Sequence, residues 1–264
     1  MSSHDAHWRA GARTPGFPRE FRIFGHWINS YKVFLCVGIY VGVVVSAVAA
    51  DSYGFSPLRM GLGSLACATT GLAGARIYHV LLHASDYANL RSWRELWDAR
   101  SGGWSLFGTL PLMAPLSFWL AGMLQIPAGT FWDCMGAGIL AGGFWVRLGC
   151  VFNGCCAGRE TTGRCGVRLH DVRLQYKRRM PVQFLEMFWW LLGMAGCIAL
   201  WPLHLPPGTY GLGVLCWYGV GRFWLEPLRE SPDLISGGIR INQLVAGLLA
   251  TIAGAAVILR LWSY

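Results

Sequence analysis

The sequence has few charged residues and even fewer acidic ones. Asp, Glu, Lys and Arg together make up 13% of the 264 residues, and only 13 residues are Asp or Glu. Soluble domains usually contain roughly 25% charged residues. This deficit, together with 54% hydrophobic residues, excludes an ordinary soluble protein. The N-terminus also lacks the order of a signal peptide, in which a short basic region, an apolar core and a small-residue cleavage site follow one another.

Internal repeats and low-complexity segments are not evident, but long apolar stretches are. About seven of them can cross a hydrocarbon core of about 30 Å: residues 33–50, 57–83, 104–123, 130–152, 183–202, 210–229 and 241–262. The 35 glycines suit close packing between such helices. The sequence therefore predicts an all-α membrane protein with about seven transmembrane helices in residues 33–264, short loops and a small basic head segment.

Residues 1–32 are polar and basic. We expect them to form an interfacial arm, partly helical, that lies on anionic lipid headgroups. The net charge of +9 could indicate nucleic acid as a partner. The basic residues flank apolar helices, however, so the bilayer and an anionic glycerophospholipid are the expected partners and nucleic acid is not.

The basic residues are asymmetric across the predicted membrane. Seventeen lie in the arm and in the segments 84–103, 153–182 and 229–240, whereas the opposite side has only Arg59 and Arg260. The positive-inside rule places the rich side in the cytoplasm. Arginines that bind lipid phosphate are not free topology signals, which weakens this interpretation.

Nine cysteines are an odd number, so at least one is unpaired or pairs between chains. Five of them lie in apolar helices, where packing is the expected role: Cys36, Cys67, Cys134, Cys197 and Cys216. The other four are clustered, with His170 nearby: Cys150, Cys155, Cys156 and Cys165. A metal site with Cys and His ligands is one interpretation, but the spacing matches no standard zinc finger, so it is the least favoured and no metal or cofactor is predicted. A disulfide and a reactive thiolate both remain open.

Six charged residues lie in or at the ends of the apolar stretches: Arg76, Asp133, Arg147, Glu186, Arg222 and Glu226. Arg222 and Glu226 are four residues apart and share a helix face. One interpretation is a set of internal ion pairs that fix the helix register. The other is an anion pocket for a lipid headgroup, which several arginines with few acids favour.

Arg147 opens the most informative run of the chain, Arg147-Leu-Gly-Cys-Val-Phe-Asn-Gly-Cys-Cys-Ala-Gly158. It resembles the signature Arg-x-Gly-Asn-Phe-x-Asn-Gly-Glu-x-x-Gly of the prolipoprotein diacylglyceryl transferase family. The matching residues are Arg147, Gly149, Asn153, Gly154 and Gly158.

Further motifs extend this resemblance over about residues 57–255, in the family's order. They are Gly74-Ala-Arg-Ile-Tyr78, Gly102-Gly-Trp-Ser-Leu-Phe-Gly-Thr-Leu110, Arg179-Met-Pro-Val-Gln-Phe-Leu-Glu186, Tyr218-Gly-Val-Gly-Arg-Phe-Trp-Leu-Glu226 with Arg229, and Asn242-Gln-Leu244. Asp133 stands fourteen residues before Arg147, as in the family.

The resemblance implies a multi-pass enzyme of the bacterial inner membrane that needs no cofactor. Such enzymes move a diacylglyceryl group from phosphatidylglycerol to a cysteine thiol of a prolipoprotein and release glycerol phosphate. Arg147 and Arg222 would bind the phosphate and stabilise its developing charge. The remaining expected site residues support or orient these groups or contact the substrate: Arg76, Arg229, Glu186, Glu226, Tyr218, Asn153, Gly154, Gly158 and Gln183.

The chain also departs from the family. Phe107 stands where the family has histidine, and Thr109 where it has glycine. Cys150 replaces the signature asparagine, and Cys155 replaces its glutamate. The predicted head between the fourth and fifth helices is short. We therefore expect the lipid-donor half of the site to be kept and the acceptor half to be altered.

Three hypotheses follow from these residues. The first is direct transfer from phosphatidylglycerol to a prolipoprotein or another thiol. The second is a covalent intermediate on Cys155 or Cys156. The third is a non-catalytic phospholipid-binding or transport-related protein. The resemblance places the arginine-rich side outside the cytoplasm, against the charge rule, so the orientation stays open.

Overall fold

A computed structural model describes residues 17–82, 106–171, 175–230, 234–235 and 239–263. Each predicted stretch corresponds to a helix whose ends differ from the prediction by a few residues. The helices are α2 (Ser30–Ser52), α3 (Pro57–Leu82), α5 (Leu106–Met123), α6 (Ala128–Asn153), α7 (Val182–Leu200), α8 (Thr209–Leu225) and α9 (Ile241–Trp262).

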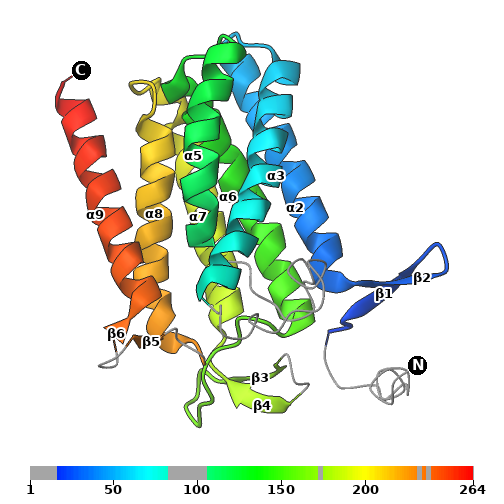
Figure 1. The fold of residues 1–264 in the computed structure, drawn as a ribbon. Coiled ribbons are helices and arrows are strands. Elements are labelled where there is room, and N and C mark those ends of the chain that lie inside the picture. The colour runs from blue at the N-terminus through cyan, green and yellow to red at the C-terminus, as the bar shows by residue number, and fades with distance from the viewer. Residues whose placement is uncertain (1–16, 83–105, 172–174, 231–233, 236–238, 264) are drawn as a thin grey trace.

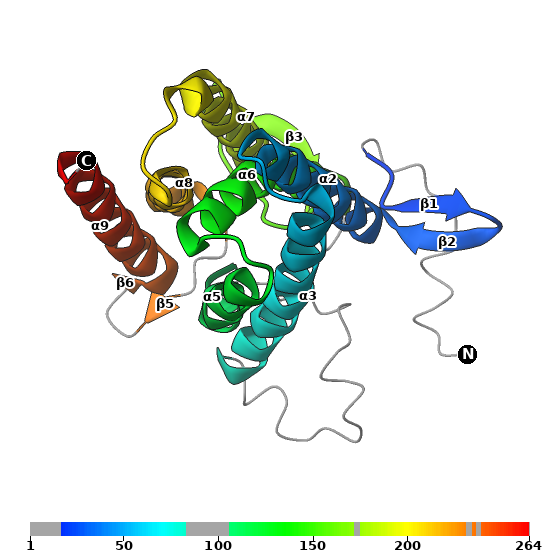
Figure 2. The ribbon, with the colours of Figure 1, turned by 90° about the horizontal axis from the view of Figure 1, so that it is seen from above.

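Four of these helices are long and apolar enough to cross a membrane: α2, α6, α9, and α7 with the short helix η3 (Trp201–Leu203) that continues it. The chain is therefore a helical membrane protein. The helices run side by side, and α6 occupies the centre, as the view along the bundle shows (Figure 2).

Helices α2 and α6 approach each other closely because glycines face one another at their contact. A Cβ atom added to Gly138 would come within 2.3 Å of the carbonyl oxygen of Gly42. One added to Gly142 would come within 2.5 Å of the carbonyl oxygen of Gly38. Small residues that bring two backbones together are typical of membrane helix packing, so the glycine content has the role expected for it at this contact.

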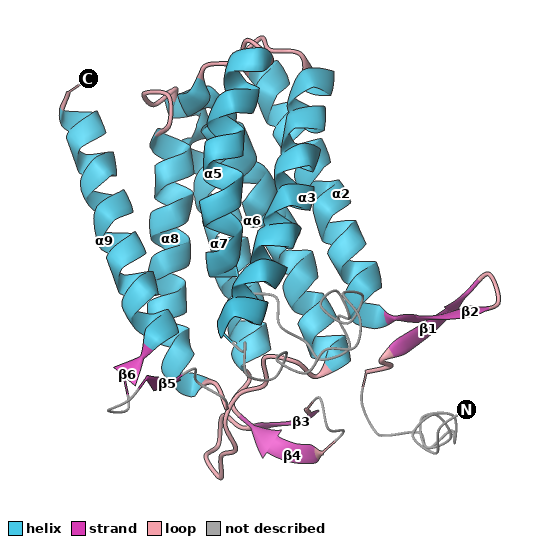
Figure 3. Ribbon diagram, viewed as in Figure 1, coloured by secondary structure: helices cyan, strands magenta, loops and turns pink. Residues whose placement is uncertain are grey.

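All described strands lie at one end of the bundle, the end opposite the C-terminal end of α9 (Figures 1 and 3). They form three antiparallel hairpins: β1 (Glu20–Ile23) with β2 (His26–Asn29), β3 (Val167–His170) with β4 (Tyr176–Arg179), and β5 (Leu234–Ile235) with β6 (Ile239–Arg240). The described chain is mostly helical, as predicted, and these short hairpins are an addition that the prediction did not include.

The first hairpin forms residues 20–29 of the predicted N-terminal arm, and α2 begins within the arm at Ser30; residues 1–16 of the arm lie outside the described residues. Phe24 and Gly25 turn the chain with φ of 47° and 81°, and two consecutive positive φ angles suit a two-residue hairpin. The Phe21 ring lies 5.8 Å from the Phe152 ring at the end of α6. Asn29 Nδ2 donates to Asn153 Oδ1 at 3.1 Å. The hairpin therefore packs against the end of α6.

The head segment between α6 and α7 is held by a buried arginine. Arg179 on β4 is 0% exposed, and its guanidinium lies 2.8 Å from Asp171 and 2.6 Å from Glu230. Isolated bridges join Glu160 to Arg179 and Gly158 to Arg229. The head is thus tied to the segment that follows α8.

Asp133 fixes the other end of the bundle. Its Oδ2 accepts a hydrogen bond from the Gly208 N–H at 2.7 Å, and its Oδ1 accepts one from the Gly211 N–H at 2.8 Å. The first N–H groups of a helix have no partner within that helix, and a carboxylate there is also attracted to the positive end of the helix dipole. Asp133 on α6 therefore caps α8.

Replacing this cap is expected to destabilise the fold. Asp133→Ala leaves two buried N–H groups without acceptors, so the free energy of unfolding should fall by about 1–3 kcal/mol. Chemical unfolding in detergent micelles measures the change. Asp51→Ala, on the exposed part of α2, is the matched control, and an equal loss in both variants would contradict the capping role.

Candidate functional site

A buried carboxylate on α7 meets three arginines at the end of the bundle that carries the strands. Glu186 Oε2 lies 3.2 Å from Arg147 Nε, on α6. Glu186 Oε1 lies 3.3 Å from Arg222 Nη1, on α8, and 2.8 Å from Arg229 Nη2. Three of the predicted site arginines are therefore gathered around one carboxylate.

Glu226 is the second carboxylate of this group. It begins the short helix η4 (Glu226–Leu228) after α8, and its side chain is 1% exposed. Its Oε2 lies 2.9 Å from Arg222 Nη2, as expected for two residues that share a helix face. Arg240 donates to the Glu226 carbonyl at 3.0 Å, and Asn242 donates to Oε1 at 3.4 Å. The start of α9 is thereby attached to the site.

We refer to Arg147, Arg222, Arg229, Glu186 and Glu226 as the arginine cluster. It contains three guanidiniums and two carboxylates, so it carries an excess of one positive charge. Buried charges are stable only when they are paired. The cluster is therefore suited to bind one further anion, which favours the anion-pocket interpretation over ion pairs with a purely structural role.

A small cavity of about 20 Å³ adjoins the cluster between α6, α7 and α8. Its lining residues are Arg147, Glu186, Trp189, Trp190, Tyr218, Gly221, Arg222 and Leu225. The volume suits about one water molecule. Tyr218 packs against Trp190 with ring centroids 6.0 Å apart. A phosphodiester can enter only if the surrounding side chains move.

Two tryptophans link α7 to α8 beside this cavity. The Trp189 and Trp217 rings are stacked, with centroids 4.0 Å apart. Each indole N–H donates to the other residue's backbone carbonyl at 3.0 Å. This reciprocal pair fixes the spacing of the two helices that carry Glu186 and Arg222.

Three cysteine thiols meet on the other side of Arg147. Cys150 is in the last turn of α6, and Cys155 and Cys156 follow its end. Their sulfur atoms all lie within 4.8 Å of one another. Arg147 Nη1 lies 3.9 Å from Cys150 Sγ and 3.7 Å from Cys156 Sγ. We call these three residues the thiol triad. Arg147 therefore has two sets of contacts: its Nη1 faces the triad, and its Nε faces Glu186.

The surroundings of Cys156 favour a thiolate. Hydrogen bonds from the Cys150 and Cys155 thiols are the main reason that the pKa of Cys156 lies well below its usual range. The positive charges of Arg229 and Arg147 lower this pKa further. The triad thus places a thiol of lowered pKa beside the arginine cluster.

Of the predicted cluster of four cysteines with His170 nearby, the structure brings only Cys150, Cys155 and Cys156 together. All nine cysteines of the chain are free thiols. Cys165 is exposed on the head, and His170 Nε2 faces the Phe152 carbonyl at 3.3 Å, so neither belongs to the described triad. Cys36 is exposed on α2, and its predicted packing role in the core is wrong.

The remaining predicted site residues occupy different positions. Gln183 Nε2 donates to the Cys155 carbonyl at 3.0 Å, and Asn153 joins α6 to the first hairpin. Gly158 approaches the Met180 backbone so closely that a Cβ atom would lie within 2.1 Å of the Met180 carbonyl oxygen. Arg76 is buried on α3, a helix that contributes no residue to the lining of the cavity. The side chain of Phe107 lies outside the described part of the structure.

Gly154 makes the turn that returns the chain from α6 toward the triad. It ends α6 with φ of 74°, and a Cβ atom there would lie 2.7 Å from the Asp171 carbonyl oxygen. Positive φ is accessible to glycine without the steric cost that other residues incur.

Gly154→Ala is therefore expected to lower the free energy of unfolding by at least about 1–2 kcal/mol. Thermal unfolding in detergent measures it. Gly163→Ala is the control, because its added Cβ would meet only a Thr161 hydroxyl at 3.3 Å. A loss no larger than the control's would show that the turn tolerates a side chain.

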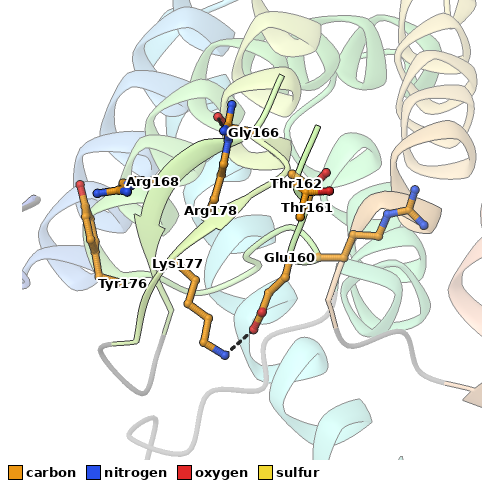
Figure 4. A pocket seen from close by; sticks show the side chains of 9 residues that line it. Glu160, Thr161, Thr162, Gly166, Arg168, Tyr176, Lys177 and Arg178 are labelled. Atoms are coloured by element: carbon orange, nitrogen blue, oxygen red, sulfur yellow. Dashed lines mark hydrogen bonds and ion pairs between the residues drawn. The ribbon is translucent and has the colours of Figure 1, made fainter. Parts of the chain in front are cut away.

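Another cleft lies on the head (Figure 4) and has a volume of about 990 Å³, much larger than that of the cavity. Its lining residues are Arg159, Glu160, Thr161, Thr162, Gly166, Arg168, Tyr176, Lys177 and Arg178. Lys177 pairs with Glu160 at 2.6 Å, and both side chains are about half exposed. Solvated charges of this kind bind weakly, so the arginine cluster is the better candidate site.

Sequence reasoning missed three residues that support the site. Arg179 and Asn242 lie in the recognised motifs but were assigned no role, and Arg240 was counted only as a surface charge. Each is positioned by a contact between segments distant in sequence, which motif spacing does not reveal.

The fold and the site define a class, a helical membrane protein with a buried cluster of arginines and glutamates beside a group of thiols. The sequence model of the prolipoprotein diacylglyceryl transferase family matches residues 18–260, and the chain belongs to that family. The chain is thereby an enzyme of the transferase class.

Two of three similar enzymes align over more than nine-tenths of the chain. The phosphatidylglycerol–prolipoprotein diacylglyceryl transferase of Bifidobacterium longum (strain NCC 2705) is 26% identical over 93% of this chain and 84% of its own. The enzyme of that name from Enterococcus faecalis is 26% identical over 91% of this chain and 89% of its own length. The enzyme of that name from Cutibacterium acnes is 31% identical over 72% of this chain and 66% of its own length.

Proposed function

We propose that this protein transfers the diacylglyceryl group of phosphatidylglycerol to a thiol, either the cysteine of a prolipoprotein or another acceptor, and releases glycerol phosphate. The observation that carries the proposal is the arginine cluster, which has one excess positive charge and adjoins three thiols. The names of the relatives specify the same donor lipid and a prolipoprotein.

The donor half of the site consists of guanidiniums that can exchange a carboxylate for a phosphate. Arg147 and Arg222 bind the phosphodiester, Arg229 supports them, and the two glutamates orient them. Because the cavity is small, phosphate binding requires Arg147 or Arg222 to move away from Glu186. Guanidinium groups bind phosphate oxygens in a bidentate manner, which compensates for the lost ion pair.

The glycerol headgroup has polar partners close by. Gln183 Oε1 is buried and has no hydrogen-bond partner among the described residues, so it can accept a hydrogen bond from a headgroup hydroxyl. Tyr218 lines the cavity and is assigned to the same headgroup. Asn153, Gly154 and Gly158 shape the backbone that carries the thiols next to it.

The reaction is a displacement at carbon. The acceptor thiol loses its proton, and its sulfur lone pair forms a bond to the glycerol carbon that carries the phosphate. The carbon–oxygen bond breaks, and its electron pair leaves with glycerol phosphate. Fixed positive charges stabilise the phosphate as its charge grows, which lowers the barrier.

Cys155 and Cys156 belong to the acceptor half of the site. A covalent intermediate on either sulfur would be a thioether, and its second step would have to expel a thiolate, which is a poor leaving group from carbon. Direct transfer to the acceptor thiol avoids this step. We therefore assign the triad to activation of the acceptor.

We propose that all seven helices cross the inner membrane of a bacterium, with the strand-bearing end outside the cytoplasm. Helices α3, α5 and α8 lie alongside the four apolar helices (Figure 1), which supports this arrangement. A reporter fused after α9 should then be active in the cytoplasm. An extracytoplasmic C-terminus would place the site in the cytoplasm and point to a cytosolic acceptor.

The test is product analysis with purified protein in vesicles that contain labelled phosphatidylglycerol. A prolipoprotein peptide or a small thiol should become a diacylglyceryl thioether as an equal amount of glycerol phosphate appears. Lipid binding without either product, for every thiol tried, would contradict transfer and support the non-catalytic alternative.

A further inference from the structure

The thiol triad has the geometry of a metal site with one open position. A tetrahedral zinc ion with Zn–S bonds of about 2.3 Å holds its sulfurs about 3.8 Å apart. The three sulfurs already lie within 4.8 Å of one another, so no pair has to close by more than about 1 Å.

The backbone brings these sulfurs together at a cost. Cys150 and Cys155 are five residues apart and are separated by the left-handed Gly154. Cys156 also has a positive φ, 56°, which is rare for a residue with a side chain and is found most often where function requires it. All three cysteines are buried or partly buried, so little solvent competes for their ligand.

We infer that Cys150, Cys155 and Cys156 hold a zinc ion whose fourth position binds the thiol of the acceptor. This inference rests on the proposed transfer reaction and deepens it. The spacing of these cysteines in sequence did not predict a metal, because it matches no standard zinc finger. The close approach of their sulfurs is visible only in the fold.

The charges of the site are compatible with such an ion. Three thiolates and one Zn²⁺ form a monoanionic complex, and the guanidinium of Arg147 lies directly beside it. Arg147 Nη1 lies 3.7 Å and 3.9 Å from two of the sulfurs. Coordinated sulfurs keep lone pairs, so the arginine can donate to them as a supporting contact.

Zinc supplies the step that this site otherwise lacks. A thiol that coordinates a metal loses its proton outright, and three protein ligands leave one position open for substrate. The proton leaves to solvent as the sulfur binds. The bound sulfur then forms a bond to the diacylglyceryl carbon, and glycerol phosphate leaves with the electron pair of the broken carbon–oxygen bond. Cys155 stands where the family has glutamate, so the chain replaces a carboxylate with a metal ligand.

Metal binding tests the site without any activity measurement. Full-length protein purified under reducing conditions should retain about one zinc per chain by elemental analysis, and added Co²⁺ should produce a thiolate charge-transfer band. Serine at any of the three positions should weaken zinc binding by more than about 100-fold. Loss of a residue that only hydrogen-bonds to a metal ligand would weaken it by about 10- to 100-fold. Cys165→Ser, an exposed thiol outside the triad, should bind zinc as the wild type does.

Several outcomes would overturn the inference. A fully reduced wild-type chain that binds no zinc overturns it, as does an equal loss in Cys165→Ser. Detection of a diacylglyceryl group on one of the three sulfurs during turnover also overturns it, because it would show a covalent intermediate. Misfolding of a serine variant does not obscure the result, because zinc can instead be stripped from the unmutated chain with a chelator.

The stripped chain separates this inference from the proposed function. It should bind phosphatidylglycerol normally, lose thioether formation by about 100-fold or more and regain it when zinc is restored. Undiminished thioether formation without metal overturns the zinc assignment and leaves the proposed function standing. A zinc-loaded chain that releases no product overturns the proposed function and the catalytic role of the metal together, whereas the binding measurement would still show whether the metal site exists.

Discussion

Arg147→Ala is expected to lower the rate of diacylglyceryl transfer by about 100- to 1,000-fold, the usual effect of removing a donor that stabilises developing negative charge. Arg147 is the residue best placed to have this effect, because it lies between Glu186 and the thiol triad. The measurement is the initial rate of glycerol phosphate release at saturating phosphatidylglycerol.

Two further variants make this prediction specific. Arg147→Lys keeps the charge but not the planar pair of donors, and should recover only part of the rate, because lysine does not bind phosphate in a bidentate manner. Arg59→Ala removes an arginine at the opposite end of the bundle, where it contacts Gln125, and should leave the rate unchanged. Equal rates for Arg147→Ala and the wild type would exclude Arg147 from catalysis.

Glu186→Gln is expected to reduce the free energy of unfolding by about 3–5 kcal/mol. The carboxylate is the shared partner of three guanidiniums, so its neutralisation leaves several buried positive charges with one acid among them. The cost of an unpaired buried charge is much larger than that of an exposed ion pair. Urea unfolding in mixed micelles, followed by tryptophan fluorescence, measures the change.

Glu160→Gln is the matched control for this prediction. Glu160 makes its ion pair with Lys177 on the exposed head, and such pairs contribute about 0–1 kcal/mol. Phosphatidylglycerol should also stabilise Glu186→Gln more than the wild type, because in the wild type the lipid phosphate competes with Glu186 for the arginines. Similar losses in the two variants would mean that the cluster is not held together by Glu186.

The helices and the donor half of the site could be predicted from local sequence. Apolar length identified each helix, and the spacing of Arg222 and Glu226 placed both on one face, where they pair. The order of motifs brought Arg147 and Glu186 into the same site. These features depend on periodicity or on family pattern, and both are readable along the chain.

The hairpins and the thiol triad depend on backbone turns that the residue types indicate poorly. Phe24-Gly25 makes a hairpin turn without the Asn-Gly or Asp-Gly pair that usually signals one. Cys155 and Cys156 return to Cys150 only because Gly154 and Cys156 both adopt positive φ. Charge pairs such as Arg179 with Glu230 join residues 51 positions apart, so they too appear only in the folded chain.

The central claim is that the arginine cluster stabilises a phosphate that departs with the oxygen of the broken bond. It can be tested with phosphatidylglycerol that carries a heavy oxygen isotope in the bridge between the diacylglyceryl carbon and phosphorus. Attack at carbon predicts that all of the label appears in the released glycerol phosphate and that the lipid product is a thioether without it. Label in free diacylglycerol would show that the phosphorus–oxygen bond breaks instead, and would contradict this account of the site.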